Sequence, residues 1–479
     1  MPYLLLFILS ALFFASIQFR FHNLVGYDSY YHLGYASLLR EEGFIKEMKW
    51  MWDTVLHYHY ADVYLLPHIL LIPFTLGNKI IMGKIAAIFF SSLVIVCFYW
   101  FLQQNKLPYP LMWTVLLLVS SPLFIRRMLY ARVSIQLSLI FCILALHFIL
   151  HKQNKMLGIL SFLFAWSYSA FFLPIAFALI YTWICYWKKK HVTLTSFIWA
   201  SGGAFLGLVI NPYFPTNIWI HYLQIVKISL FRQPGFFNAE WQSLGIGQFF
   251  YFSYLILIIF VLLIVFALYS YYNRQRSVLH LSQETLFIFL IVLIFGLLYF
   301  HSVRIVEYFI PFSILSLAYL AKDIKLDHAK LGSLCLAIIL IGGVINYVQI
   351  VKAVPYFDTI NNYEGCALWL QNNTAKDSHV FIQFWDQMPP LFFYNRHNVY
   401  TLGLEEHFLY YYNSSLMDKY RDAIDGEGSP YEILTQDFKV DYVFIYTGKD
   451  AYPFYLTLKN ETRIKARYSD VACAVLEIQ

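Results

Sequence analysis

Residues 26–32 read Gly-Tyr-Asp-Ser-Tyr-Tyr-His and follow closely after an apolar run at 2–19. The run is long enough to cross a bilayer, which needs about 20 apolar residues in a helix. Asp28 and His32 therefore stand at the edge of an expected membrane domain, where ionisable side chains are costly unless they serve a function. The alternative is an interfacial loop rich in tyrosine, because Tyr gathers where a membrane meets water.

The composition of the whole chain is that of a membrane protein. Of its 479 residues, 60% are hydrophobic, 20% aromatic and only 13% charged, and the mean hydropathy is positive. These values exclude an ordinary soluble enzyme. The formal net charge of +6 does not predict a nucleic-acid partner, because much of the Lys and Arg lies in short loops between apolar runs. No small-residue cleavage site follows 2–19, so we expect this run to remain as the first span.

The apolar runs predict a polytopic α-helical membrane protein with about 11 spans. We place the spans at 2–19, 83–102, 109–125, 133–150, 156–170, 171–187, 193–211, 249–272, 284–301, 305–321 and 330–350. Basic residues gather in alternate loops, at Lys106, Lys152, Lys155, Lys188–Lys190, Arg274, Arg276, Lys322, Lys325 and Lys330. The positive-inside rule puts these loops and the N-terminus in the cytoplasm. We thus expect a membrane domain over 1–350 in the plasma (inner) membrane, with long outer loops at 20–82 and 212–248.

Three arginines fall on the expected outer side, against the positive-inside rule: Arg126, Arg127 and Arg132. Two explanations stay open. They hold a phosphate, or their long side chains simply extend to the interface.

The tail 351–479 differs from the rest, since its apolar runs are short and its charges regular. Strands are predicted at 380–385, 398–402, 441–446 and 471–478, and helices at 361–373, 389–394 and 416–424. This alternation predicts a small extracytoplasmic α/β domain. Cys366 and Cys473 can pair in an oxidising compartment or remain two buried thiols, and spacing alone does not decide.

The polar clusters that suggest chemistry fall on the expected outer face. Asp28 and Glu240 come from separate long loops and can share a divalent cation, Mg²⁺ or Mn²⁺, that would clamp a pyrophosphate leaving group. The planar guanidinium of Arg304 suits a phosphate or a carboxylate. His57 and His59 match no zinc-ligand spacing, and no nucleotide-binding glycine loop or Ser-His-Asp signature is present.

Four motifs, in chain order, resemble those of the oligosaccharyltransferase catalytic subunits of the PglB and AglB type, which are GT-C glycosyltransferases. Asp28-Ser29-Tyr30-Tyr31-His32 is similar to their first-loop motif, whose aspartate binds the metal and helps engage the acceptor. Asn238-Ala239-Glu240-Trp241-Gln242 is similar to the loop motif whose glutamate completes the site. Arg304 opens a span as the family's outer arginine does, and Phe384-Trp385-Asp386 is similar to the Trp-Trp-Asp motif that reads the acceptor's hydroxyl amino acid.

The chain also departs from this family. A paired acidic motif should follow Arg132, but Val133-Ser134-Ile135-Gln136 stands there instead. Either Asp62 substitutes from the first loop or no metal binds. The tail motif has one tryptophan, with Gln387-Met388-Pro389-Pro390 after it. The resemblance therefore implies a divergent relative, whose acceptor need not be an asparagine sequon.

The resemblance implies transfer of a sugar or glycan from a polyprenyl-phosphate or -pyrophosphate carrier, in contact with membrane lipid, to a protein, lipid or polysaccharide acceptor. Asp28 and Glu240 would be catalytic and would bind the tentative metal. The residues expected to contact substrate are Tyr31, His32, Asp62, Arg132, Arg304, Glu307, Trp385 and Asp386. We expect Asp28, Glu240 and Arg304 to converge on one cavity, with Trp385 and Asp386 ending a strand that faces it. A non-catalytic glycan-lipid transporter or assembly protein is the alternative, but the charges lie at loop ends and not at span centres, which favours an enzyme.

Overall fold

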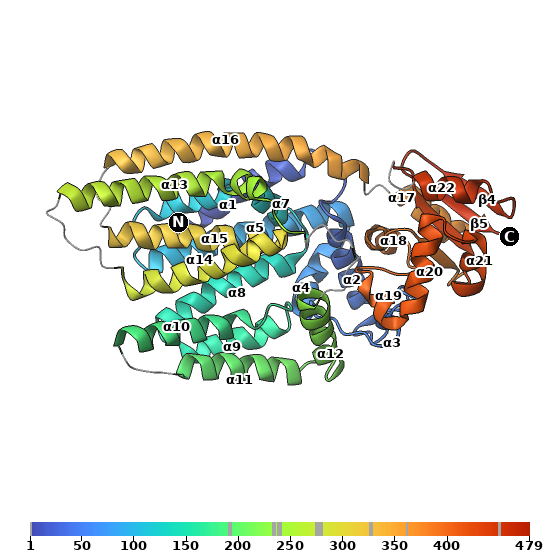
Figure 1. Ribbon diagram of the computed structural model, residues 1–479, viewed down its shortest axis with the longest axis horizontal. Helices are drawn as coiled ribbons and strands as arrows, with labels where there is room; N and C mark the ends of the chain where they lie inside the picture. The colour runs from blue at the N-terminus through green and yellow to red at the C-terminus, as the bar shows by residue number, and fades with distance from the viewer. Residues whose placement is uncertain are drawn as a thin grey trace.

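The computed structural model describes residues 2–189, 194–231, 236, 242–273, 281–324, 329–360, 363–448 and 452–479. A bundle of long helices is joined at one end to a smaller domain that contains a five-stranded sheet (Figure 1). The segments that follow α1 and the C-terminal domain meet at this end of the bundle.

Every range predicted as a span coincides with a helix or a pair of helices. The single helices are α1 (Pro2–Gln18), α5 (Lys79–Gln104), α8 (Val133–Leu150), α9 (Asn154–Ala165), α10 (Leu173–Lys189), α11 (Thr195–Val209), α13 (Ile246–Asn273), α14 (Gln283–His301), α15 (Val306–Asp323) and α16 (Ala329–Ile360). Among the described residues, 6 helices are long and apolar enough to cross a membrane, or 7 if one bent pair is a single span. The chain is therefore an integral membrane protein, while α1, α9, α10 and α11 are shorter apolar helices.

The range predicted as one span at 109–125 is two helices. α6 (Pro110–Val119) and α7 (Pro122–Met128) meet at a bend of 86°. Pro122 has no N–H to donate and disfavours helical backbone in the residue before it, so α6 ends at Val119 and α7 starts at Pro122. The bend carries the chain sideways toward Arg127 and Arg132.

The range predicted as a span at 156–170 ends early as a helix, at Ala165. The indole N–H of Trp166 donates to the carbonyl of Gly207 at 2.8 Å, and residues 166–172 form a turn before α10. α9 and α11 approach so closely that a Cβ on Gly203 would lie 2.0 Å from the carbonyl oxygen of Gly158. Such contacts between small residues are common where membrane helices pack.

The outer segments are short helices. They are α2 (Tyr27–Glu42), α3 (Val55–Tyr58), α4 (Leu65–Leu71), η1 (Ile72–Thr75), α12 (Thr216–Tyr222), the π-helix η2 (Leu223–Leu230) and η4 (Val303–Ile305). The segment before α3 extends the C-terminal sheet, because Trp52 N–H donates to Tyr400 O at 2.8 Å and Tyr400 N–H donates to Trp50 O at 3.0 Å. The first long loop and the tail are thus one hydrogen-bonded unit, which agrees with their expected placement on the same side.

The sheet has the order β2-β1-β3-β5-β4, with β1 parallel to β2 and β3, and β5 antiparallel to β3 and β4. The strands are β1 (His379–Ile382), β2 (Val399–Tyr400), β3 (Tyr442–Tyr446), β4 (Ile464–Ser469) and β5 (Cys473–Ile478). The helices of this domain are α17 (Glu364–Asn373), η5 (Trp385–Gln387), α18 (Met388–Tyr394), α19 (His407–Tyr412), α20 (Ser414–Asp425), α21 (Pro430–Glu432), η6 (Ile433–Asp437) and α22 (Tyr452–Lys459). β4 was not predicted, because this edge strand is mostly exposed and carries Lys465 and Arg467 in place of alternating apolar residues.

The sequence left open whether Cys366 and Cys473 are paired or remain free thiols, and the structure shows that they are paired. Cys366 of α17 and Cys473 of β5 form a disulfide, with 6.3 Å between their Cα atoms. The bond ties α17 to β5, which lies between β3 and the edge strand β4. It fits an oxidising compartment, as expected for an outer domain.

Candidate functional site

A cavity of about 660 Å³ lies where the helical bundle meets the C-terminal domain. Its walls come from α2, the turn after α9, η2, the α14–α15 junction and two segments of the tail domain. The apolar part is lined by Phe172, Ile225, Ile228, Leu230, Leu298, Ile305, Leu404 and Phe408. The polar part is lined by Tyr27, Asp28, Tyr31, His32, Tyr64, Arg132, Tyr168, Ser169, Gln224, Ser229, His301, Ser302, Arg304, Tyr308 and Glu405, with Trp385 beside them. The cavity is therefore amphipathic, with ionisable groups on one part of its wall.

Asp28 lies in the first turn of α2, and local geometry fixes where it points. The helix starts after Gly26, which has φ 75° and packs so closely on Tyr130 that a Cβ would lie 2.8 Å from its ring. Only glycine adopts this backbone without strain in that space. Ser29 Oγ then accepts the N–H of Ala131 at 3.0 Å, which joins α2 to the chain just before α8.

This junction sets Asp28 against Arg132, and the two side chains form an ion pair. The Arg132 side chain is 5% exposed and that of Asp28 is 21% exposed, so the carboxylate is the more accessible partner. A second nitrogen of Arg132 lies 3.4 Å from the hydroxyl of Tyr64. The ion pair was not predicted, since the partners are far apart in sequence and Arg132 was expected to hold the carrier's phosphate or the acceptor.

Arg304 lies in η4, far from Asp28 along the sequence, yet it lines the same cavity. Its guanidinium donates to the hydroxyl of Tyr168 and lies 5.5 Å from the centre of that ring. Val303 N–H donates to Gln242 O at 3.1 Å, which fixes the turn that carries Arg304. The tyrosine rings beside Arg304 and Arg132, Tyr168 and Tyr64, are 6.0 Å apart. Two cationic groups thus face one cavity, an arrangement suited to a phosphate.

A chain of hydrogen bonds runs from the cavity into the protein. His32 Nδ1 lies 2.7 Å from His68 Nε2, and His68 Nδ1 lies 2.7 Å from Asp62 Oδ2. The other oxygen of Asp62 accepts the N–H of Tyr64 at 2.9 Å. His32 lines the cavity, whereas Asp62 is 1% exposed and is not among the described lining residues. Asp62 was expected to contact substrate, so its place is corrected to the buried end of this chain.

Glu307 and Tyr31 were also expected to contact substrate, and the structure places them differently. Glu307 accepts from Arg127 Nε at 2.6 Å in a buried ion pair and is not among the described lining residues. Its expected substrate contact is therefore replaced by a structural one. Tyr31 does line the cavity, and its hydroxyl lies 2.9 Å from that of Tyr60.

The tail motif reaches the site from the other side. Trp385 lines the cavity and meets the ring of Tyr27 edge-on at 6.1 Å. Trp385 and Asp386 lie in η5, just after β1, and not at the end of the strand as predicted. Burial, together with the negative charge of Asp28, raises the pKa of Asp386 to about 6. Glu405, which lines the cavity and lies 3.1 Å from His407, was missed because no motif marked it.

Glu240 lies outside the described residues, so the predicted convergence of Asp28 and Glu240 stays a prediction. The described residues around Asp28 do not fit a divalent cation. Within the described part of the chain, the one group of three close His, Cys, Asp or Glu ligands is Cys366, Asp470 and Cys473, where the two sulfurs are bonded to each other. Asp28 itself faces a guanidinium. The steps that we propose for this protein are therefore assigned to its own residues and not to a metal ion.

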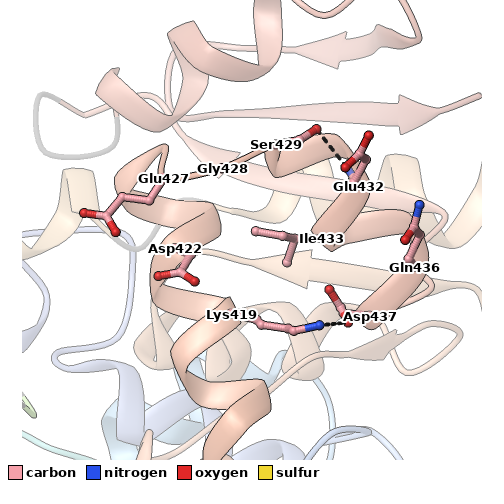
Figure 2. A pocket seen from close by; sticks show the side chains of 9 residues that line it. All are labelled: Lys419, Asp422, Glu427, Gly428, Ser429, Glu432, Ile433, Gln436 and Asp437. Carbon is pink, nitrogen blue, oxygen red and sulfur yellow. Dashed lines mark hydrogen bonds and ion pairs between the residues drawn. The ribbon is translucent and has the colours of Figure 1, made fainter.

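A second hollow, of about 400 Å³, lies on the C-terminal domain between α20 and η6. Figure 2 shows its acidic rim, with Lys419 paired to Asp437 and Ser429 bonded to Glu432. It lies on the face of that domain formed by these helices and contains none of the predicted site residues. We assign it no function.

Three solved structures are similar to this chain in fold. The Archaeoglobus fulgidus oligosaccharyltransferase in its apo form matches with a TM-score of 0.63 and 12% identity, over 93% of this chain and 69% of that one. The same protein has been solved in complex with Zn and sulfate, and matches with a TM-score of 0.59. ArnT from Cupriavidus metallidurans, bound to undecaprenyl phosphate, matches with a TM-score of 0.56 and 11% identity, over 99% of this chain and 98% of that one.

The chain has the GT-C glycosyltransferase fold. The mycobacterial arabinofuranosyltransferase AftD shares it, with a TM-score of 0.54 and 12% identity over 99% of this chain, although that chain is much longer and only 40% of it is covered. No family model matches the sequence, and neither does any curated protein. The low identities agree with the expectation of a divergent member, and at this level the likeness concerns the fold.

Proposed function

We propose that the protein transfers a sugar or glycan from a polyprenyl-phosphate or -pyrophosphate carrier to an acceptor on the outer face of the plasma (inner) membrane. One observation carries the proposal: an apolar cavity at the end of a membrane bundle has Arg132 and Arg304 on its wall. An isoprenoid carrier joins a long apolar chain to a charged phosphate, and the cavity offers surfaces of both kinds.

The arginines would act on the leaving group. When the bond between sugar and phosphate breaks, negative charge grows on the phosphate oxygen, and fixed cations near that oxygen lower the barrier. Tyr168 and Asp28 orient the two guanidiniums before the donor arrives. Such preorganisation costs nothing at the moment of reaction, and the donor needs no further activation because its phosphate is already a good leaving group.

The acceptor would enter beside the C-terminal domain. Trp385 presents an aromatic face to the cavity, and sugars or peptides pack on such faces. Asp386 lies next to it with a raised pKa, and Glu405 lines the same part of the cavity. In this arrangement the donor's lipid contacts the apolar wall, and the tail domain closes the acceptor side. The roles of Glu240 and of a divalent cation in this proposal rest on the sequence motif alone.

The fold supports this function because ArnT, one of the similar proteins, was solved with undecaprenyl phosphate. The transporter alternative is less well supported. Its substrate site would be expected near the middle of the membrane between broken helices, whereas the charged groups here line a cavity formed by residues of the bundle and of the tail domain.

The test is transfer from a radiolabelled polyprenyl-phosphate sugar by the purified protein in detergent. Arg304→Met should reduce kcat by roughly 10²-fold or more, the scale for loss of one preorganised electrostatic group. Arg396→Met is the matched control, because Arg396 pairs with Glu41 at 2.6 Å and does not line the cavity. Lipid movement without sugar transfer would favour the transporter. Equal activity of Arg304→Met and wild type would contradict the proposed site.

A further inference from the structure

The hydrogen-bonded chain His32–His68–Asp62 is longer than the burial of the Asp62 carboxylate requires. Asp62 already accepts two hydrogen bonds, from His68 Nδ1 and from Tyr64 N–H, so its charge is compensated without His32. The chain nevertheless continues to a third group, and that group is the one that lines the cavity. A purely structural pair would not need this extension.

With His68 neutral, the order of the hydrogen bonds gives one arrangement of protons along the chain. The carboxylate of Asp62 can only accept, so His68 donates through its Nδ1–H. Neutral His68 then has a lone pair at Nε2, which accepts the Nδ1–H of His32 at 2.7 Å. His32 Nε2 is left without a proton, and it is the atom available for a group in the cavity. A carboxylate holds the catalytic imidazole in the same way in serine hydrolases, through one contact fewer.

We propose that His32 is the general base of the transfer reaction, held by His68 and Asp62 as positioning residues, and that the acceptor group is a hydroxyl. The proposal rests on the proposed function and deepens it by naming the acceptor chemistry. His32 lies one helical turn after Asp28 on α2, so both face the same cavity.

The surroundings of His32 keep its ring neutral, so an unprotonated nitrogen is present before the acceptor binds. Burial, with the positive charges of Arg132 and Arg304 nearby, holds the pKa of His32 well below its ordinary value. The titratable and charged groups around it are Asp28 and Tyr31 on its own helix, Tyr64 and His68 at α4, Arg132 before α8 and Arg304 in η4. At neutral pH the imidazole then carries its lone pair in nearly every molecule.

The reaction balances with these groups alone. The acceptor oxygen forms a bond to the anomeric carbon of the sugar, and its O–H bond breaks as the proton passes to His32 Nε2. The bond from the anomeric carbon to the carrier oxygen breaks, and its electron pair stays on the phosphate, which faces Arg132 and Arg304. Asp62 stabilises the imidazolium through His68. The proton is then released to water, which returns His32 to its starting state.

The base also discriminates between acceptor classes. One imidazole can take the proton of a hydroxyl as oxygen attacks, the way it does for serine. The nitrogen of an asparagine side chain shares its lone pair with the carbonyl, as in a peptide bond, so taking one proton does not by itself free an attacking pair. His32 therefore favours the hydroxyl of a glycan or a lipid over a side-chain amide.

The experiment compares His32→Gln with His59→Gln, an exposed histidine of the same loop, using the full-length protein. His32→Gln should lower kcat by about 10²–10⁴-fold, while the affinity for undecaprenyl phosphate stays within about twofold. His59→Gln should match wild type. A helix-permissive His32→Ala variant, given free imidazole, should recover part of its rate, which a merely structural role would not allow. Wild-type kcat should fall as the pH drops below the ordinary histidine range, and this fall should be absent in His32→Gln.

The acceptor is tested in parallel with a hydroxyl-bearing alkyl glycoside, a lipid alcohol and a sequon peptide. We expect product with one or both of the first two. Product with the peptide alone would overturn the acceptor assignment, and full activity of His32→Gln would overturn the base. If wild type neither binds the labelled donor nor transfers its sugar, the proposed function itself fails. If wild type transfers and His32→Gln does too, only the present inference fails.

Discussion

Replacing Asp28 by Asn should separate its catalytic effect from its structural one. Asn keeps the shape and an oxygen that can still accept from Arg132, but the negative charge is lost. The Arg132 side chain is only 5% exposed, so its charge then lacks a carboxylate in a poorly solvated place. Breaking a buried ion pair costs about 3–5 kcal/mol, and the 21% exposure of the Asp28 side chain places this case near the lower end. Loss of one preorganised electrostatic group should also lower kcat by roughly 10²–10³-fold.

Glu307→Gln is the matched comparison, because Arg127 and Glu307 form a second buried pair whose side chains are 6% and 1% exposed. This pair is not among the described lining residues, so the variant should lose about 3–5 kcal/mol of stability while folded molecules keep their kcat. The assay measures thermal unfolding in detergent together with single-turnover transfer from a labelled donor. The reasoning is refuted if Asp28→Asn transfers at the wild-type rate, or if Glu307→Gln loses as much kcat as Asp28→Asn.

Four other outcomes are expected. Replacing Cys366 and Cys473 by Ser opens a link across 107 residues and should destabilise the tail domain by up to about 4–5 kcal/mol, seen as a lower Tm. Asp386→Asn should raise the Tm at pH 8 and reduce acceptor use. Because the folded pKa of about 6 exceeds the ordinary 3.8, the wild-type protein loses stability as the pH rises between these values. The difference in Tm between variant and wild type should therefore disappear toward pH 3.8. Alkaline phosphatase fused after residue 479 should be active, whereas activity of a cytoplasmic reporter there would reverse the topology. EDTA tests the divalent cation that the Glu240 motif suggests: transfer should be lost and then restored by Mg²⁺ or Mn²⁺ where the cation takes part, whereas transfer within about twofold of the untreated rate would remove the cation from the proposal.

The helices of the bundle were predictable because each depends on a local property, an apolar run of sufficient length. The errors occur where a local signal was weak or ambiguous. The run 109–125 is apolar throughout, so the bend at Pro122 was read as part of one span although Ser120-Ser121-Pro122 carried a signal for a break. β4 lacks apolar alternation because it is an exposed edge, and pairing with β5 decides its conformation.

Asp28, Arg132 and Arg304 line one cavity, but their partners were not predicted. The three residues stood out in the sequence because charges are rare in such a chain and their positions at span ends are visible. Which partner each would take depends on how helices far apart in sequence pack. Arg127 reaches Glu307 across 180 positions, a contact that no local pattern could indicate. His68 was visible as one histidine of the first outer loop, but only the fold shows that it links Asp62 to His32.

The cavity wall is divided between the two parts of the chain, and this division bears on the order of substrate entry. Ile225, Leu298 and Ile305 come from the membrane domain, whereas Trp385 and Glu405 come from the tail domain. The tail domain cannot swing freely, because residues 50–52 pair with Tyr400 and α2 packs on α18. Under the proposed function, a lipid-linked donor would approach from the bilayer side and an acceptor from the domain side. His32, the two arginines and Asp28 line the cavity between these approaches, where the proposed sugar transfer would take place.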